Sequence, residues 1–154
     1  MHPMDKIQAL SRAMALCSKT EYSEANIRGK LKYWETSPED VDAIIDHLTR
    51  EKFIDDLRYA NAYVKDKVRL NHWGRIKIRY MLSMEKVKHS VIDQVLAEID
   101  EELYSDTLKD LLQKKLRELK GESNAQSKKQ KLLKFAQSRG FEIELALRLM
   151  KDLS

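Results

Sequence analysis

The chain has 154 residues, of which 42% are hydrophobic and 35% are charged, and its net charge of +4 divides into −2 over residues 1–58, +4 over residues 59–99 and +2 over residues 100–154. Only four Gly and two Pro among many Leu, Lys, Glu and Ala exclude a long disordered tract and favour helices. No apolar run reaches about 18 residues, which excludes a membrane-spanning helix, and the basic excess favours an anionic partner.

Three helices are predicted in the first third of the chain. The first runs from about Asp5 to Cys17, with apolar residues at helical spacing. The second begins after Ser23, because serine is a good N-cap. The third opens with Ser37-Pro38, where serine caps the helix and proline takes the first helical position.

The same pattern restarts after residue 54. Asp55 is expected to cap a fourth helix, which the Asn-His-Trp-Gly sequence at residues 71–74 ends. A fifth helix follows this break and contains Ile78 and Leu82. A sixth begins near Lys88, so this part of the chain also holds three helices.

Three further helices are predicted in the last third. The seventh spans about Glu101 to Leu119 and ends before Gly121, which begins a polar linker at residues 121–127. The eighth runs from Lys128 to about Ser138, and the ninth from Glu142 to Leu153.

Apolar positions recur along these nine helices at spacings of 51 and then 54 residues, with one extra residue before Val41 in the first unit, so that Val41 and Val91 are 50 apart. Three short amphipathic helices bury little surface alone, and stacked repeats share a core. We therefore predict an all-α fold: an elongated, curved array of three tandem three-helix repeats, at residues 1–54, 55–100 and 101–154. Nine unrelated helices in one globule remain the alternative. The recurring residues are Ile27, Leu31 and Val41, then Ile78, Leu82 and Val91, then Leu132, Ala136 and Leu145.

The sequence carries no recognised catalytic pattern. It contains no P-loop, GxGxxG, HExxH or GxSxG motif, and the acidic pair Asp55-Asp56 would point in different directions on a helix. The histidines are scattered without metal-ligand spacing, at His2, His47, His72 and His89. We therefore expect no enzyme activity, no metal and no cofactor.

The single cysteine, Cys17, makes an internal disulfide impossible and is expected to be a small buried hydrophobe. The first ten residues do not have the apolar run of a secretory signal peptide. A chain without disulfides fits a reducing compartment, and we expect it in the cytoplasm.

Basic residues supply the candidate partner-binding or DNA-binding surface. On a helical wheel Arg75, Arg79 and Lys86 fall on one side of the fifth helix, and Trp73 precedes it. Helix starts attract phosphate, and an exposed indole stacks on bases. A solvated charged face is the alternative for the cations, and packing over a helix joint is the alternative for Trp73. The candidates are Lys65, Lys67, Arg69, Trp73, Arg75, Lys77, Arg79, Lys86, Lys128 and Lys131.

Several short motifs, in order and spacing, resemble those of the RecX family. They are Tyr22-Ser23 followed by Leu31, then Phe53-Ile54-Asp55-Asp56-x-Arg58-Tyr59-Ala60-x-x-Tyr63-Val64, then Gly74-Arg75-Ile76-Lys77-Ile78 with Leu82 four residues on. The last motif departs from the family pattern, because Arg75 stands in place of the usual proline and Ile76 in place of a usual basic residue.

The resemblance implies a protein that regulates the RecA recombinase. Members of the RecX family are three-helix repeat arrays that bind the RecA–DNA filament and inhibit its recombinase and ATPase activities. The partners implied are the RecA filament and single- and double-stranded DNA, with no membrane, and the chain is expected to be a monomer. The alternatives are a helical DNA-binding module that acts independently of RecA, and a protein scaffold without nucleic-acid affinity.

Overall fold

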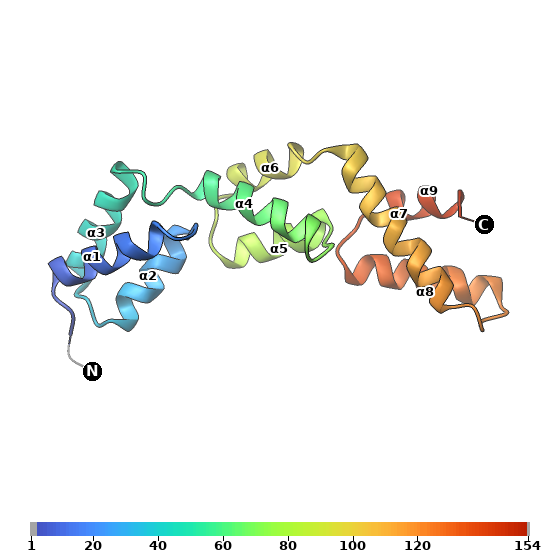
Figure 1. The fold of residues 1–154 in the computed structure, drawn as a ribbon, viewed down its shortest axis with the longest axis horizontal. Helices are drawn as coiled ribbons and strands as arrows, with labels where there is room; N and C mark the ends of the chain where they lie inside the picture. The colour runs from blue at the N-terminus through green and yellow to red at the C-terminus, as the bar shows by residue number, and fades with distance from the viewer. Residues whose placement is uncertain (1–2, 154) are drawn as a thin grey trace. The chain divides into compact units, whose positions relative to one another are not determined.

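A computed structural model describes residues 3–153, which form nine α-helices and no strand, as the sequence predicts (Figure 1). No helix within these residues is both long and apolar enough to cross a lipid bilayer. The helices are α1 (Lys6–Cys17), α2 (Glu24–Tyr33), α3 (Pro38–Arg50), α4 (Asp56–Arg69), α5 (Arg75–Met84), α6 (His89–Ala97), α7 (Glu101–Glu118), α8 (Ala125–Ser138) and α9 (Ile143–Met150).

The predicted N-caps are confirmed. The Ser23 side chain accepts a hydrogen bond from the Asn26 amide, and the Ser37 side chain accepts one from the Asp40 amide. The Asp55 carboxylate accepts the amides of Leu57 and Arg58. These side chains satisfy backbone N–H groups that have no partner within the helix.

The predicted linker at residues 121–127 is too long. Helix α8 begins at Ala125, three residues before the predicted start, because the Asn124 side chain caps it by accepting the Ser127 amide. Helix α9 is shorter than predicted, from Ile143 to Met150. Cys17 at the end of α1 is half-buried, where we expected full burial, and burial still raises the pKa of its thiol, with a smaller contribution from Glu21.

The turn after the second helix of each predicted repeat has the same backbone conformation. Glu35, Lys86 and Gly140 have φ values of 59°, 61° and 88°. In each turn the amide of the following residue bonds back to a buried helical residue, namely Leu31, Leu82 or Ala136. The three turns are separated by 51 and 54 residues, the spacings of the apolar positions.

The chain divides into two compact units. The N-terminal unit comprises the residues up to Ala62 together with Leu82–Ile92, and the C-terminal unit comprises Tyr63–Met81 and the residues from Asp93 on. Helices α1, α2 and α3 pack on one another in the first unit, and α7, α8 and α9 do so in the second (Figure 1). The repeat boundaries at residues 54/55 and 100/101 stay predictions.

Within the N-terminal unit, the start of α2 packs against the next helical triplet. The amide of Glu24 donates to the Asp56 carboxylate (2.9 Å), at the first residue of α4. Glu85, in the turn after α5, accepts hydrogen bonds from the hydroxyls of Ser23 and Tyr59 and from the Asn26 side chain. We call this contact the first junction.

Within the C-terminal unit, the start of α5 makes an equivalent contact, which we call the second junction. The amide of Arg75 donates to the Tyr104 hydroxyl (2.8 Å), and that hydroxyl donates to Glu142 in the turn after α8. The amide of Gly74 donates to the Arg139 carbonyl (2.7 Å). Tyr59 and Tyr104 are both the fourth residue of their helices, so the two junctions share one design.

Two glycines bring the backbones together in the second junction. A Cβ on Gly74 would lie 2.4 Å from the Gly140 carbonyl oxygen, and a Cβ on Gly140 would lie 2.3 Å from the Cβ of Lys77. Gly140 also has a positive φ, which strains any side chain. Glycine is therefore required at both positions by lack of space.

We predict that Gly74→Ala lowers the free energy of unfolding by about 1–3 kcal/mol, because backbone must move to admit the methyl group. The matched control is Gly29→Ala in α2, where nothing lies within 4 Å of the added Cβ. There the gain in helix propensity raises stability by up to ~1 kcal/mol. Urea unfolding of both variants, followed by circular dichroism, checks the prediction. Equal stability of the two variants would contradict it.

Candidate partner-binding surfaces

Trp73 and two lysines form a cluster in the C-terminal unit. The ammonium of Lys67 lies 4.8 Å from the centre of a Trp73 ring, and that of Lys77 lies 4.6 Å from it. Lys67 also lies 5.3 Å from the centre of the Tyr63 ring. The half-buried indole therefore joins α4 to α5 while it holds two cations near the surface. Of the predicted candidates, the structure brings these three together.

Lys65 and Arg69 lie on the exposed side of α4, on either side of Lys67 in the sequence. Neither makes an ion pair with a carboxylate in the described part of the chain. Each is two residues from Lys67, so both lie on the other side of α4 from the Trp73 cluster and form a separate pair of cations.

Arg75 is part of the second junction. Its side chain is 20% exposed and makes ion pairs with Glu142 (2.9 Å) and Glu101. Its guanidinium also lies 4.2 Å from the centre of the Tyr104 ring. Burial by itself lowers the pKa of Arg75, but the hydrogen bond and charge of Glu142, together with Tyr104 and Glu101, outweigh it, and the pKa is raised. The structure thus uses this cation to join two helical triplets.

Two other candidates differ from the helical-wheel prediction. Arg79 is exposed but pairs with Asp93 (2.6 Å), so its charge is neutralised locally. Lys86 does not share a helical face with Arg75 and Arg79, because α5 ends at Met84 and Lys86 has a positive φ. The prediction that these three cations share one helical face is wrong, because α5 ends two residues before Lys86.

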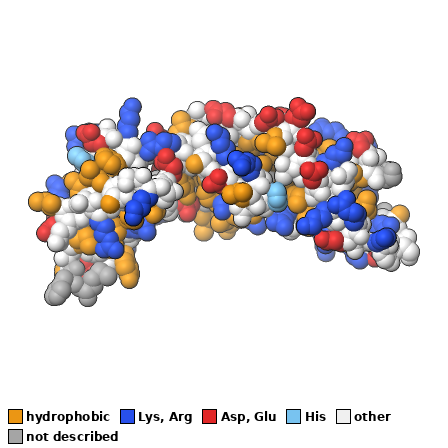
Figure 2. All heavy atoms as spheres, in the orientation of Figure 1, with side chains coloured by type: hydrophobic (Ala, Val, Ile, Leu, Met, Phe, Trp, Pro, Cys, Tyr) orange, Lys and Arg blue, Asp and Glu red, His pale blue; other side chains and the backbone are white. Residues whose placement is uncertain are grey.

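The remaining candidates lie on α8. Lys131 pairs with Glu122 (2.8 Å), and this contact lowers the pKa of the Glu122 carboxyl. Lys128 is half-buried in the second turn of the helix. Lys and Arg side chains gather in this region, at the lower right of the space-filling view (Figure 2).

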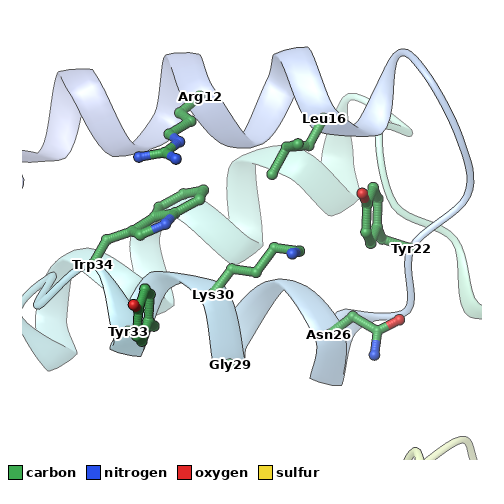
Figure 3. A pocket seen from close by; sticks show the side chains of 8 residues that line it. All are labelled: Arg12, Leu16, Tyr22, Asn26, Gly29, Lys30, Tyr33 and Trp34. Atoms are coloured by element: carbon green, nitrogen blue, oxygen red, sulfur yellow. The ribbon is translucent and has the colours of Figure 1, made fainter.

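A groove between α1 and α2 of the N-terminal unit was missed by sequence reasoning. Its volume is about 660 Å³. Arg12 lies over Trp34 at 4.6 Å from the ring centre, and Lys30 lies over Tyr22 at 5.4 Å. Figure 3 shows Arg12 pointing from α1 toward Trp34, with Lys30 and Tyr33 on α2 below. Tyr33 is 72% exposed, so its ring is available to a ligand.

A second hollow, of about 350 Å³, lies on the other side of Gly29, which lines both. The cations Lys32, Lys86 and Lys88 line it, and all three are exposed. Asp56 lies at its edge, and burial raises the pKa of that carboxyl despite its hydrogen bond from the Glu24 amide.

The groove escaped sequence reasoning because its charge is local. Residues 1–58 carry a net charge of −2, which masks the basic side of α2. Lys30 and Tyr33 lie about one helical turn apart on α2, a spacing that only weakly indicates a binding site. Arg12, the other cation of the groove, comes from a different helix. Only the packing of α1 on α2 places its guanidinium over Trp34.

In the described residues, no three His, Cys, Asp or Glu side chains are grouped as metal ligands would be. His2, one of the four scattered histidines, lies outside the described residues.

Comparison with known families accounts for the three helical triplets. Residues 9–48 match the first three-helix domain of RecX, residues 55–96 the second, and residues 101–150 the third. The chain belongs to the RecX family. The three domains follow one another in the family's order, which confirms the resemblance seen in the sequence motifs and the division into three three-helix repeats.

Individual RecX proteins support this assignment. The regulatory protein RecX of Clostridium acetobutylicum is 32% identical over 138 residues, covering 88% of this chain and 64% of that protein. The one from Clostridium botulinum strain Eklund 17B is 31% identical over 147 residues, covering 95% and 68%. The chain thus spans about two thirds of the length of these relatives. A crystal structure of regulatory protein RecX superimposes with a TM-score of 0.87 at 26% identity, covering 95% of this chain and 71% of that one.

We predict that Tyr104→Phe lowers the free energy of unfolding by about 1–3 kcal/mol, because the Arg75 amide and Glu142 lose their shared partner in a buried site. The phenol is fully buried, and its burial and the Glu142 hydrogen bond raise its pKa. Tyr80→Phe is the matched control, because the Tyr80 side chain is 63% exposed and its loss of a hydroxyl should change stability by less than about 0.5 kcal/mol. Urea unfolding measures both changes. An unchanged free energy of unfolding in Tyr104→Phe would show that the hydroxyl does not stabilise the second junction.

Proposed function

We propose that this protein modulates the RecA recombinase by binding the RecA–DNA filament, and that it inhibits the recombinase and ATPase activities. The observation that carries this proposal is the ordered match of all three RecX domains along residues 9–150. The relatives are named regulatory proteins, which supports action by binding. We further propose that the protein acts in the cytoplasm, as a monomer and without catalytic residues or a cofactor.

The Trp73 cluster is the proposed contact surface in the C-terminal unit. Lys67 and Lys77 are held by the indole, and Lys65 and Arg69 add positive charge on the same helix as Lys67. Cations in fixed positions lose little entropy when they bind carboxylates or phosphates. Arg75 contributes by holding the second junction together, so reversing its charge would test folding as well as binding.

The double variant Lys67→Glu/Lys77→Glu should inhibit the DNA-dependent ATPase of RecA about tenfold less well than the wild type, which corresponds to about 1.4 kcal/mol of binding free energy. Lys19→Glu, an exposed lysine near the end of α1, is the control of equal charge change per site and should inhibit normally. Circular dichroism confirms that each variant is folded.

Two results would count against the proposal in different ways. No inhibition by the wild-type protein, at several-fold molar excess over filament sites, would overturn RecA modulation itself. Full inhibition by Lys67→Glu/Lys77→Glu would keep the function and remove the Trp73 cluster from it.

A second candidate function is nucleic-acid binding that does not require RecA. It is favoured by the groove between α1 and α2, where Arg12 and Lys30 lie beside the exposed ring of Tyr33. Cations beside an exposed aromatic ring are the usual elements of single-strand binding, since phosphates meet the cations and bases stack on the ring. The lysines of the neighbouring hollow extend this basic surface.

Fluorescence anisotropy with a labelled oligothymidylate tests this candidate. We expect salt-dependent binding that weakens about tenfold in Tyr33→Ala, because a stacked base contributes ~1–3 kcal/mol. Tyr80→Ala removes another exposed tyrosine, outside the groove, and should leave the affinity unchanged. Binding that is absent, or that is equal in the two variants, would exclude the groove as a single-strand site.

A further inference from the structure

An apolar groove of about 1110 Å³ lies among α7, α8 and α9 of the C-terminal unit. Its apolar lining includes Leu116 from α7, Leu132 from α8, and Leu147 and Met150 from α9. All but Leu132 are only half-buried. The volume exceeds that of most small-molecule sites, and a groove lined by leucine and methionine is typical of surfaces that receive an amphipathic helix.

The edge of this groove is basic. Arg117, Lys120, Lys128 and Lys129 line it, and no carboxylate lines it in the part of the chain that the structure describes. Two acidic residues close to the lining in the sequence, Glu118 and Glu122, are held in ion pairs with Lys115 and Lys131, and a third, Asp152, does not line the groove. Its charge is therefore complementary to an acidic partner.

The groove occupies the position of a junction in the repeat. Ser23 and Glu24 form the first junction, and the residues 51 positions later, Gly74 and Arg75, form the second. The residues another 54 positions later are Lys128 and Lys129, which line the groove. Helix α8 begins about one turn earlier in the repeat than α2 and α5 do, so the Lys128 amide already donates to the Asn124 carbonyl. At the repeat position where the first and second domains present a free amide, the third domain therefore presents the side chains of Lys128 and Lys129.

Burial at equivalent positions agrees with this reading. Counted from the equivalent turns at Glu35, Lys86 and Gly140, one repeat position holds Ile45, Leu96 and Met150. Ile45 and Leu96 are 4% and 3% exposed, whereas Met150 is half-buried and lines the groove. Leu147 takes the repeat position of Asp42 and Asp93, which pair with arginines in the earlier domains. The third domain is therefore more apolar at its open face than the earlier ones.

The two existing junctions indicate what such a face binds. In each, the following triplet supplies a carboxylate and a tyrosine from the first turn of its first helix, Asp56 and Tyr59 or Glu101 and Tyr104. It also supplies a glutamate from the turn after its second helix, Glu85 or Glu142. These contacts satisfy charge and backbone N–H groups at the start of a helix. An acidic helix is thus the occupant that the repeat already uses.

Other occupants fit less well. The groove has no aromatic side chain among its described lining residues, so bases of a single strand would find nothing to stack on. A second copy of this chain would offer Lys6, Ala9 and Trp34 at the places of Asp56, Tyr59 and Glu85, and none of these is acidic.

We propose that the groove among α7, α8 and α9 is a docking site for an acidic amphipathic helix of a partner protein. The helix packs its apolar side on Leu116, Leu147 and Met150 and sets its carboxylates against Lys128 and Lys129. This inference does not depend on RecA regulation, because it rests on the junction geometry within the chain.

The probe is a fluorescein-labelled peptide of residues 100–112, the junction helix that already contains Glu101 and Tyr104. A hydrocarbon staple replaces the side chains of Ser105 and Lys109, because a free helix of this length is marginal in water. Five carboxylates remain in the peptide, from Asp100, Glu101, Glu102, Asp106 and Asp110. The control peptide carries the same staple with all five replaced by amides. Fluorescence anisotropy against the full-length protein gives both affinities.

We expect saturable binding of the acidic peptide, and binding about tenfold weaker in Lys128→Glu/Lys129→Glu. Lys134→Glu changes one exposed lysine of α8 outside the groove lining, with half the charge change of the double variant, and should leave the affinity within about twofold. The amide peptide should bind more weakly than the acidic one. Circular dichroism of the variants confirms that the helices are intact.

The proposal is overturned if the acidic peptide does not bind at roughly millimolar protein, or if Lys128→Glu/Lys129→Glu binds as tightly as Lys134→Glu. It is also overturned if oligothymidylate or phosphatidylglycerol vesicles bind the protein and lose affinity in Lys128→Glu/Lys129→Glu, while the peptide does not bind. Analytical ultracentrifugation tests for self-association. If the protein self-associates and Lys128→Glu/Lys129→Glu abolishes this, the occupant of the groove is a second copy of the chain and the proposal is overturned. RecA inhibition by the same variants is a separate measurement, so the two proposals fail independently.

Discussion

A hydrogen bond at the start of a helix holds consecutive triplets together in this protein. The first amide of α2 donates to Asp56, and the first amide of α5 donates to Tyr104. Both groups belong to the first helix of the following triplet, and a glutamate in the turn after the second helix accepts from a tyrosine there. An amide with no partner in its own helix is thus satisfied by a group of the next triplet within the same unit, and it would be costly to leave unpaired.

The contacts between and within triplets explain why Arg75 and Arg79 are not available to a partner, whereas Lys67 and Lys77 are. Arg75 makes ion pairs with Glu101 and Glu142 and lies over the Tyr104 ring, and Arg79 makes an ion pair with Asp93. Lys67 and Lys77 instead lie on an indole, which orients them without neutralising their charge. The planar guanidinium of Arg75 suits it to contact two carboxylates and an aromatic ring at once.

The same constraint gives the third domain its open face. Where the earlier domains meet a following triplet, the last one exposes leucines, a methionine and a ring of cations. An exposed apolar groove rimmed by cations is typical of an interaction surface. The surfaces proposed for binding are thus chemically different: the Trp73 cluster, the aromatic groove of α1 and α2, and the apolar groove of α7, α8 and α9.

The sequence by itself determined the helices, because Ser23, Ser37 and Asp55 are local caps and the apolar positions recur at helical spacing. It also determined the family, because short motifs keep their order. It did not determine which cations are free: Arg75 and Arg79 are neutralised by residues from 14 to 67 positions away in the chain, and Arg12 meets Trp34 from another helix. Charge pairing depends on distance in space, and only the tertiary structure decided those distances.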